Sequence, residues 1–363
     1  MRILVGMPEK GSQGGPAACE PPFIDELRRL GNEVEEEVYA YAETQLGLIR
    51  RILRVIQTAR RFRQRIRTGK FDLLHINTSF DSRALLRDFV IISSLPAAGT
   101  KIFLKFHGSD GRLLETNNSV LRYLGRYLLK QAQGIGVLSS EERDNFLNSG
   151  VPEKKIFLIK NVVQNKLEAP DPQFRAKMNL PEDVPLLLFI GRFIETKGLM
   201  DVISACKLLR ECNQPFMLLC VGDGPAREGA EVEVDRLGLE SNVRFFGYVP
   251  EEQTAAFYVN STILLFPTYH YEGFPMVIFN ATAAGLPIIT TRIRAAADYL
   301  KEPNNCLWVE PRRPDLLADR IIEVLGSAEV RATANSSNKQ LSSHFSAEIV
   351  TEEYLKVYER ASG

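Results

Sequence analysis

The stretch ILLFPTYHYEGFPMVIFNATAAGLPII, residues 263–289, gives the clearest indication of the fold class. Its first four residues are an apolar run that predicts a buried strand, and Pro267 ends that run. After Glu272 and Gly273, apolar residues recur at helical spacing until Gly285 and Pro287 stop the helix, and a second apolar run follows. Strand, loop, helix and strand in this order predict a parallel α/β unit.

The loop in this stretch is also the first candidate site. Ligands of parallel sheets bind at the carboxyl ends of the strands, and a helix N-terminus there suits a phosphate. Glu272 lies at this mouth, with Asn280 about two turns further along the helix. A carboxylate would repel a phosphate, so Glu272 is better suited to accept hydroxyl protons, and the pair suggests a sugar nucleotide. Alternatively, Glu272 only complements the helix dipole and Asn280 is a surface residue.

Length and composition fit a protein of two α/β domains. The chain has 363 residues, 45% of them hydrophobic and 25% charged. Lysine plus arginine equals aspartate plus glutamate, so the chain has no excess of positive charge that would indicate binding to nucleic acid. A segment rich in proline and acids, 167–184, predicts the linker between residues 1–165 and 166–345.

The cysteines, histidines and apolar runs indicate a cytoplasmic protein. The five cysteines are odd in number and form no paired motif, so we expect reduced thiols. The four histidines show no metal-ligand spacing, and there is no Asp-x-Asp pair, so we expect neither a metal nor another cofactor. No apolar run approaches the roughly 20 residues that span a bilayer, and the first residues do not have the pattern of a signal peptide.

Near the N-terminus, a strand at 3–5 runs into a glycine-rich loop that includes Gly14 and Gly15, and we predict a helix from about Pro22 to Leu30. Glycines let the backbone approach a ligand closely. Their spacing is not that of G-x-G-x-x-G, and no clear ribose-binding acid ends the next strand, so a dinucleotide site is weakly indicated. A flexible surface loop is the alternative.

A long basic helix is predicted over 46–66. Leu48, Ile52 and Val55 begin an apolar stripe that continues to Ile66. The remaining positions hold eight arginines: Arg50, Arg51, Arg54, Arg60, Arg61, Arg63, Arg65 and Arg67. Like charges at this density destabilise a helix unless an anion compensates. An anionic membrane surface is one explanation, and a core-packed helix with a solvated basic face is the other.

Other polar residues follow predicted strands. His107 follows a strand at 102–106, where it faces either a ligand cleft or a neighbouring carbonyl. Arg192 and Lys197 occupy the loop between a strand at 186–190 and the next helix. Two cations there suit a diphosphate leaving group and replace a metal, although either one could instead pair with Glu195. Glycine-containing loops at 222–225 and 247–250 also follow strands, so all these loops should lie at one sheet edge.

In this order, the motifs resemble those of the retaining glycosyltransferases of family 4, from Met1 to the last helix. They are Gly14-Gly15, His107-Gly108-Ser109-Asp110, Gly191-Arg192-Phe193 with Lys197-Gly198, Val221-Gly222-Asp223-Gly224-Pro225, and Phe266-Pro267 leading to Glu272-Gly273-Phe274-Pro275. The resemblance implies the GT-B architecture of two facing Rossmann-like domains with parallel sheets. The N-terminal domain would bind the acceptor and the C-terminal domain the nucleotide sugar. A C-terminal helix, 346–363, would cross back to the first domain.

The resemblance also implies roles for individual residues. Arg192 and Lys197 would bind the diphosphate with N–H groups near Gly273 and Phe274, in segments that include Gly191 and Pro275. Glu272 would bond hydroxyls of the donor sugar, and His107 would contact that sugar near the reacting carbon. Gly14 and Gly15 would admit the diphosphate and acceptor, and backbone around Tyr248 and Val249 would contact the base.

The implied reaction is transfer of a sugar from a UDP- or GDP-sugar to an acceptor hydroxyl with retention of configuration. The basic helix suggests a lipid-linked saccharide or glycolipid at the cytoplasmic membrane face, as in bacterial surface polysaccharide synthesis. One departure from the family is Asn280, where a second glutamate usually binds the ribose hydroxyls, so donor binding could be weaker. The alternatives are a sugar-nucleotide epimerase or hydrolase of the same fold, or a catalytically weak sugar-nucleotide binding module.

Overall fold

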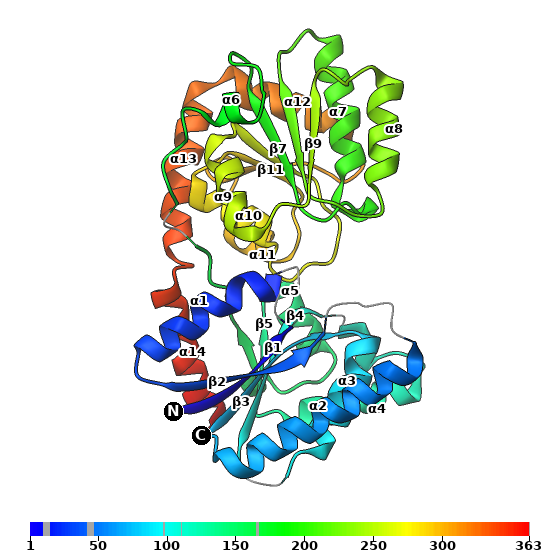
Figure 1. The fold of residues 1–363 in the computed structure, drawn as a ribbon, viewed down its shortest axis with the longest axis vertical. Helices are drawn as coiled ribbons and strands as arrows, with labels where there is room; N and C mark the ends of the chain where they lie inside the picture. Colours follow the sequence, from blue (N-terminus) through cyan, green and yellow to red (C-terminus); the bar gives the residue numbers. More distant parts are fainter. Residues whose placement is uncertain (10–14, 42–46, 97–98, 110, 165–166, 363) are drawn as a thin grey trace. The chain divides into compact units, whose positions relative to one another are not determined.

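The computed structural model describes residues 1–9, 15–41, 47–96, 99–109, 111–164 and 167–362 (Figure 1). They form two compact units. The first consists of Met1–Val162, Glu272–Phe274 and Ala347–Gly363, and the second of Val163–Tyr271 and Pro275–Ser346. Each unit contains one six-stranded, wholly parallel sheet with helices between its strands. This confirms the predicted fold class, and the last helix belongs to the first unit.

The sheet of the first unit has the strand order β2-β1-β3-β4-β5-β6. Its strands are β1 (Arg2–Pro8), β2 (Glu33–Ala40), β3 (Leu73–Phe80), β4 (Lys101–Ser109), β5 (Gly134–Val137) and β6 (Ile156–Leu158). Its helices are α1 (Gly15–Arg29), α2 (Leu48–Gly69), α3 (Ser82–Ser94), α4 (Ser119–Gln131), α5 (Ser140–Asn148) and α14 (Ala347–Ser362), with short 3-10 turns η1 (Gly111–Leu114) and η2 (Glu153–Lys155). Helices α1 and α14 lie side by side, and α3 packs between α2 and α4 (Figure 1).

The sheet of the second unit has the strand order β12-β11-β10-β7-β8-β9. Its strands are β7 (Leu186–Ile190), β8 (Met217–Val221), β9 (Val243–Gly247), β10 (Ile263–Phe266), β11 (Ile288–Thr290) and β12 (Cys306–Trp308). Its helices are α6 (Phe174–Lys177), α7 (Leu199–Glu211), α8 (Arg227–Leu237), α9 (Glu251–Asn260), α10 (Met276–Ala284), α11 (Arg294–Tyr299), α12 (Pro314–Gly326) and α13 (Ala328–Ser343), with a 3-10 turn η3 (Glu195–Lys197).

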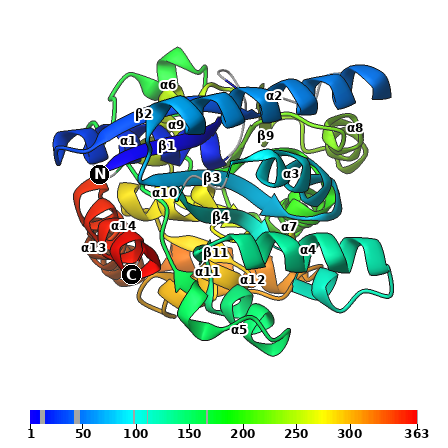
Figure 2. The same ribbon diagram turned by 90° about the horizontal axis from the view of Figure 1, so that it is seen from below.

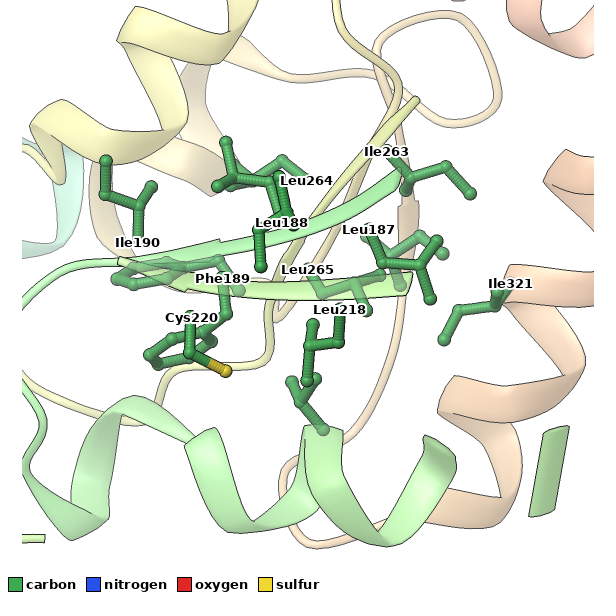
Figure 3. Close-up of a cluster of buried hydrophobic side chains, with 14 of the residues drawn as sticks. Leu187, Leu188, Phe189, Ile190, Leu218, Cys220, Ile263, Leu264, Leu265 and Ile321 are labelled. Carbon is green, nitrogen blue, oxygen red and sulfur yellow. The ribbon is translucent and has the colours of Figure 1, made fainter. Parts of the chain in front are cut away.

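Continuous apolar runs explain the central strands. Every residue of β7 (LLLFI) and β8 (MLLCV) is buried, as expected for parallel strands covered on both faces. Figure 3 shows this core, where Leu187, Leu188 and Leu218 lie among side chains from β10 and from Ile321 of α12. Because strand and helix alternate, the carboxyl end of every strand falls at the same edge of its sheet.

Two predicted helix starts are wrong. Helix α1 begins at Gly15 and contains Pro21 and Pro22, whereas the prolines suggested a start at Pro22. The site helix α10 begins at Met276 with Pro275 as its N-cap residue, so Glu272 precedes the helix instead of lying in its first turn. Proline marks a possible first residue but does not fix where a helix begins.

The predicted linker and the last third of the chain also differ from expectation. Phe174 and Leu180, inside 167–184, are buried in the second core because their side chains pack against it. Helix α13 was not predicted because its buried residues, Ala334, Asn338 and Ser342, are small or polar and form no apolar stripe. The Asn338 amide instead donates hydrogen bonds to the carbonyls of Leu286 and Asn305.

Candidate functional site

The loops at the carboxyl edge of the second sheet are tied to one another. The Gly191 N–H donates to the Val221 carbonyl (2.9 Å), and the Gly222 N–H donates to the Gly247 carbonyl (2.8 Å). Gly222 has a φ of 135°, and a Cβ there would lie 1.9 Å from the Gly191 oxygen, so no other residue fits. The loops that follow β7, β8 and β9 therefore lie at one edge, as predicted.

Lys197 lies directly over the end of β7. It ends the 3-10 turn η3, and Gly198 (φ 83°) then leads into α7. Its Nζ is 5.6 Å from the centroid of the Phe266 ring at the end of β10. A Cβ on Gly191 would lie 3.7 Å from the same nitrogen. The ammonium is therefore held between the ends of two central strands, where helix and strand ends favour anionic ligands.

Arg192 is exposed in the same loop, five residues before Lys197. The acid between the two cations, Glu195, pairs with Arg312 at 3.7 Å. Both members of that pair are largely exposed, so it contributes little to stability. The loop thus presents two cations beside backbone that approaches the sheet edge closely.

Asn280 is engaged in a contact that the sequence did not predict. Its Nδ2 donates to Glu251 Oε1 (3.1 Å) at the first turn of α9. Burial raises the pKa of Glu251, and the neighbouring Glu252 adds to this, while the Asn280 amide opposes it. Tyr248, exposed, and Val249 precede Glu251 in the loop after β9. A carboxylate therefore lies beside Asn280, supplied by a different helix.

The segment that precedes α10 is largely buried. Gly273 and Phe274 are buried and Glu272 is partly exposed. These three residues belong to the first unit, whereas Tyr271 and Pro275 belong to the second. Pro275 provides no side-chain cap for α10. At the N-terminus, Gly15 opens α1, and Gly14 falls outside the described residues.

His107 lies within β4, not after it, because that strand continues to Ser109. Its Nε2 is 2.7 Å from Asn77 Oδ1 on β3 and 3.7 Å from Glu20 Oε1 on α1. Burial, followed by the charge of Lys105, lowers the pKa of His107 to about 3. The imidazole is therefore neutral at physiological pH.

A buried ion pair lies behind this histidine. Lys105 Nζ donates to Glu20 Oε1 at 2.6 Å, and both side chains are buried. The sequence pattern did not predict a role for these residues or for Asn77. The one available signal was a lysine in the middle of the apolar run IFLKF. Such a charge is almost never buried without a partner, but nothing local identifies the partner.

The arginine-rich helix α2 divides into two parts. Toward its C-terminus, Ala59, Phe62 and Ile66 are buried, while Arg61 and Arg65 pair with acids of β2: Glu37 (2.9 Å) and Glu35 (2.5 Å). These acids compensate part of the positive charge. The helix is thus anchored to the sheet along this half.

The N-terminal part of α2 does not follow the predicted stripe. Leu48 and Ile52 are 73% and 51% exposed, and Ile49, Leu53 and Ile56 are exposed as well. A 22-residue helix is about 33 Å long, longer than an eight-residue strand, so its first turns extend beyond the sheet. Figure 2 shows these turns running past α3. Exposed leucines and isoleucines there alternate with Arg50, Arg51 and Arg54.

Two kinds of feature are absent from the described part of the chain. Among the described residues, no group of three or more histidine, cysteine or acidic side chains could hold a metal ion. Within the same residues, no helix is long and apolar enough to cross a membrane.

Both halves of the chain match known families. Residues 170–341 match the family described as glycosyl transferases group 1, and residues 23–166 match glycosyltransferase family 4. Relatives include an uncharacterized glycosyltransferase of Methanocaldococcus jannaschii, 27% identical over 251 residues, which are 66% of this chain and 63% of that protein. The capsular polysaccharide biosynthesis glycosyltransferase CapM of Staphylococcus aureus is 24% identical over 294 residues, 75% of this chain and 77% of CapM.

Solved structures agree in fold. A glycosyltransferase of Rickettsia africae superposes with a TM-score of 0.79 at 18% identity, covering 99% of this chain and 98% of that one. Anabaena HepE in complex with UDP has a TM-score of 0.76 at 18% identity, covering 98% and 99%. The fold and the matches to both halves together support the assignment of this chain to the GT-B glycosyltransferases.

Proposed function

We propose that this protein transfers a sugar from a nucleotide diphosphate sugar to an acceptor hydroxyl and retains the anomeric configuration. The main support for this proposal is the position of two cations. Arg192 and Lys197 occupy the loop between β7 and α7, and the Lys197 ammonium lies over the ends of β7 and β10. HepE binds UDP in a structure of the same fold, and CapM acts in capsular polysaccharide biosynthesis by name. These relatives support a UDP-sugar donor and a saccharide acceptor.

In the proposed reaction, the bond between the sugar carbon and the diphosphate oxygen breaks as the acceptor oxygen bonds that carbon from the same face. The acceptor proton passes to the departing diphosphate oxygen. Arg192 and Lys197 stabilise the charge that develops there, in place of a metal. His107 contacts the donor sugar, Glu272 bonds its hydroxyls, and N–H groups near Gly273 and Phe274 bind the diphosphate beside Pro275.

The nucleoside part of the proposed site involves the loop after β9. Backbone around Tyr248 and Val249 contacts the base. We assign the ribose hydroxyls to Glu251, oriented by Asn280, because a carboxylate accepts hydroxyl protons and is unsuited to a phosphate. The Asn280 amide, which replaces the family's second glutamate, then acts indirectly. Gly14, Gly15 and Gly191 allow the diphosphate and acceptor to approach the backbone closely.

A thermal-shift panel with UDP, GDP, ADP and their sugar conjugates, with and without EDTA, tests the donor. One nucleotide at about 100 times its Kd should stabilise the protein by about 2.7 kcal/mol, roughly 5–10 °C, and EDTA should not remove the effect. Fluorescence of Trp308, the only tryptophan, reports on the second unit directly. No shift at millimolar nucleotide would favour the weak binding module, and donor consumption without acceptor would favour a hydrolase or epimerase.

The same panel includes 2′-deoxy and 3′-deoxy forms of the nucleotide that binds. The native protein should bind the deoxy forms with a higher Kd than the ribonucleotide. In Glu251→Gln the ratio of these two Kd values should fall by about tenfold, which corresponds to the loss of one charged hydrogen bond. Glu252→Gln, the adjacent acid on the same helix, is the control and should leave it unchanged. Equal discrimination in Glu251→Gln would exclude Glu251 from the ribose site.

The N-terminal turns of α2 suggest where the acceptor lies. We propose that exposed Leu48, Ile49, Ile52 and Leu53, flanked by Arg50, Arg51 and Arg54, bind an anionic membrane surface, with support from Arg60 and Arg63 along the helix. Arg61, which pairs with Glu37, is not part of this surface. A lipid-linked saccharide or glycolipid at the cytoplasmic face would then be within reach as the acceptor.

Cosedimentation with vesicles containing anionic lipid tests this surface. Each basic residue near such a surface contributes about 1 kcal/mol, so Arg50→Gln with Arg54→Gln should weaken partitioning by about 30-fold. The control is Arg126→Gln with Lys130→Gln, two exposed cations of α4. Binding should also disappear at high salt and with neutral vesicles. Absence of binding at low salt would refute the membrane proposal.

A further inference from the structure

A connected set of buried polar side chains joins α1, β3 and β4 in the first unit. Glu20, Asn77 and Lys105 are 0%, 5% and 1% exposed. Asn77 and Lys105 are opposite each other in the register of β3 and β4. Glu20 Oε1 accepts from Lys105 (2.6 Å), and Glu20 Oε2 accepts from Asn77 Nδ2 (3.0 Å). Burying two charges is costly, so this ion pair need not increase the free energy of unfolding. We therefore looked to function for the reason that it is present.

The ionic state of this pair is well defined. Burial lowers the pKa of the Lys105 ammonium, but the negative charge of Glu20 has the larger effect, and the pKa is raised overall. Burial likewise opposes the charge of Glu20, but Lys105 outweighs it and lowers the pKa of the carboxyl to about 2. Glu20 is therefore an ionised carboxylate, which can only accept hydrogen bonds.

This carboxylate determines which way the Asn77 amide faces. The NH₂ group must point at Glu20 Oε2, and it also donates to the Gly6 carbonyl (3.3 Å). The amide oxygen is then the atom that faces His107 Nε2, at 2.7 Å. Because an amide oxygen can only accept, Nε2 must carry the proton, and Nδ1 keeps its lone pair.

We propose that Asn77, held by the Glu20–Lys105 pair, is a positioning residue that fixes His107 in its Nε2–H tautomer and presents Nδ1 as a hydrogen-bond acceptor. This rests on the proposed function in one respect: the group that Nδ1 meets is a hydroxyl of the donor sugar. An acceptor at this point matches a hydroxyl and rejects a phosphate or carboxylate oxygen, which has no proton to offer.

The surroundings of the imidazole include several titratable groups. Glu20 faces it from α1, His75 from β3 and Lys105 from β4. From α14, Tyr354 lies over Lys105, and the Tyr358 hydroxyl contacts His75 Nδ1. Burial, followed by the charge of Lys105, outweighs the attraction of Glu20 and keeps the pKa of His107 low, so the imidazole stays neutral even with a carboxylate 3.7 Å away. Replacing the Asn77 amide by a second carboxylate would remove that balance.

The test is imidazole ¹⁵N spectroscopy of the ligand-free full-length protein, in which four histidines give few signals. His107, assigned by its loss in His107→Gln, should show one protonated nitrogen, Nε2, unchanged from pH 8 to pH 5. Asn77→Asp should convert it to the doubly protonated form near neutral pH, because a carboxylate then faces Nε2. An Nδ1–H tautomer, or an imidazolium at pH 6 in the native protein, would overturn the proposal.

Kinetics supply the second readout. The kcat of Asn77→Asp should be about tenfold lower at pH 6 than at pH 8, since an imidazolium cannot accept a hydrogen bond from the sugar hydroxyl. The native enzyme should not show this loss. The control is Asn118→Asp at the N-cap of α4, an equally good cap in the same unit. If the native enzyme has no transferase activity, the proposed function is refuted. The ¹⁵N spectra test the tautomer of His107 separately, because they require no activity.

Discussion

Replacing Lys197 by alanine is expected to lower kcat by about 10²–10³, by analogy with loss of one oxyanion-stabilising donor. The ammonium lies 5.6 Å from the Phe266 ring centroid, over the strand ends where the departing diphosphate is proposed to sit. Its charge matters most when the leaving group becomes negative, so the loss should appear in kcat and not only in KM. Steady-state kinetics at saturating donor measure both constants.

The matched control is Lys207→Ala. Lys207 is a partly exposed lysine on α7 that pairs with Glu211 at 3.5 Å, ten residues from the proposed site residue. Removing such a surface pair should change stability by less than about 1 kcal/mol and leave kcat unchanged. Full activity in Lys197→Ala would refute the assignment. A rise in KM with unchanged kcat would show that Lys197 binds the donor substrate but does not stabilise the transition state.

The first unit is expected to lose stability as pH falls, because of His75. This side chain is fully buried among aromatic rings of α1, β4 and α14, and burial lowers its pKa to about 4. In the unfolded chain the pKa is about 6.5, so the unfolded state takes up the proton first. The contribution is fully present above pH 6.5 and is lost as pH falls to about 4, a loss of about 3 kcal/mol.

Two neighbours act in the same direction. The pKa of His107 is lowered to about 3, and Glu20, at about 2, loses its contribution as pH falls below about 4.5. Hydrogen exchange of peptides from β3 and β4 measures the opening free energy of this unit between pH 7 and pH 4. Fluorescence of Trp308 in β12 reports on the other unit as an internal reference.

The comparison variant is His75→Phe with Tyr358→Phe. These two side chains are hydrogen-bonded to each other, and replacing both partners by apolar groups of similar shape avoids leaving one unsatisfied. The double variant should keep about 3 kcal/mol more of its stability on acidification than the native protein. Identical pH dependence in both proteins would show that His75 is not responsible.

Local pattern was sufficient for most of the architecture. Apolar runs such as LLLFI and ILLF correctly predicted β7 and β10 to the residue, because a strand buried on both faces must be continuously apolar. The alternation of strands and helices predicted two parallel sheets, and therefore placed Gly191, Gly222 and Gly247 at one edge. Errors occurred where a helix lacked an apolar stripe, as in α13, or where proline lay inside a helix, as in α1.

The fold class, the loops at the strand ends and the two cations proposed to bind the diphosphate could all be predicted from the sequence. All of these follow from neighbours within a few residues, since strand and helix periodicity are local properties. The partners of the polar residues could be identified only in the three-dimensional structure. Glu20 meets Lys105 across 85 positions, Asn280 meets Glu251 across 29, and His75 meets Tyr358 across 283. A buried charge or amide requires a partner, but which one it finds depends on strand register and helix packing, which no local pattern records.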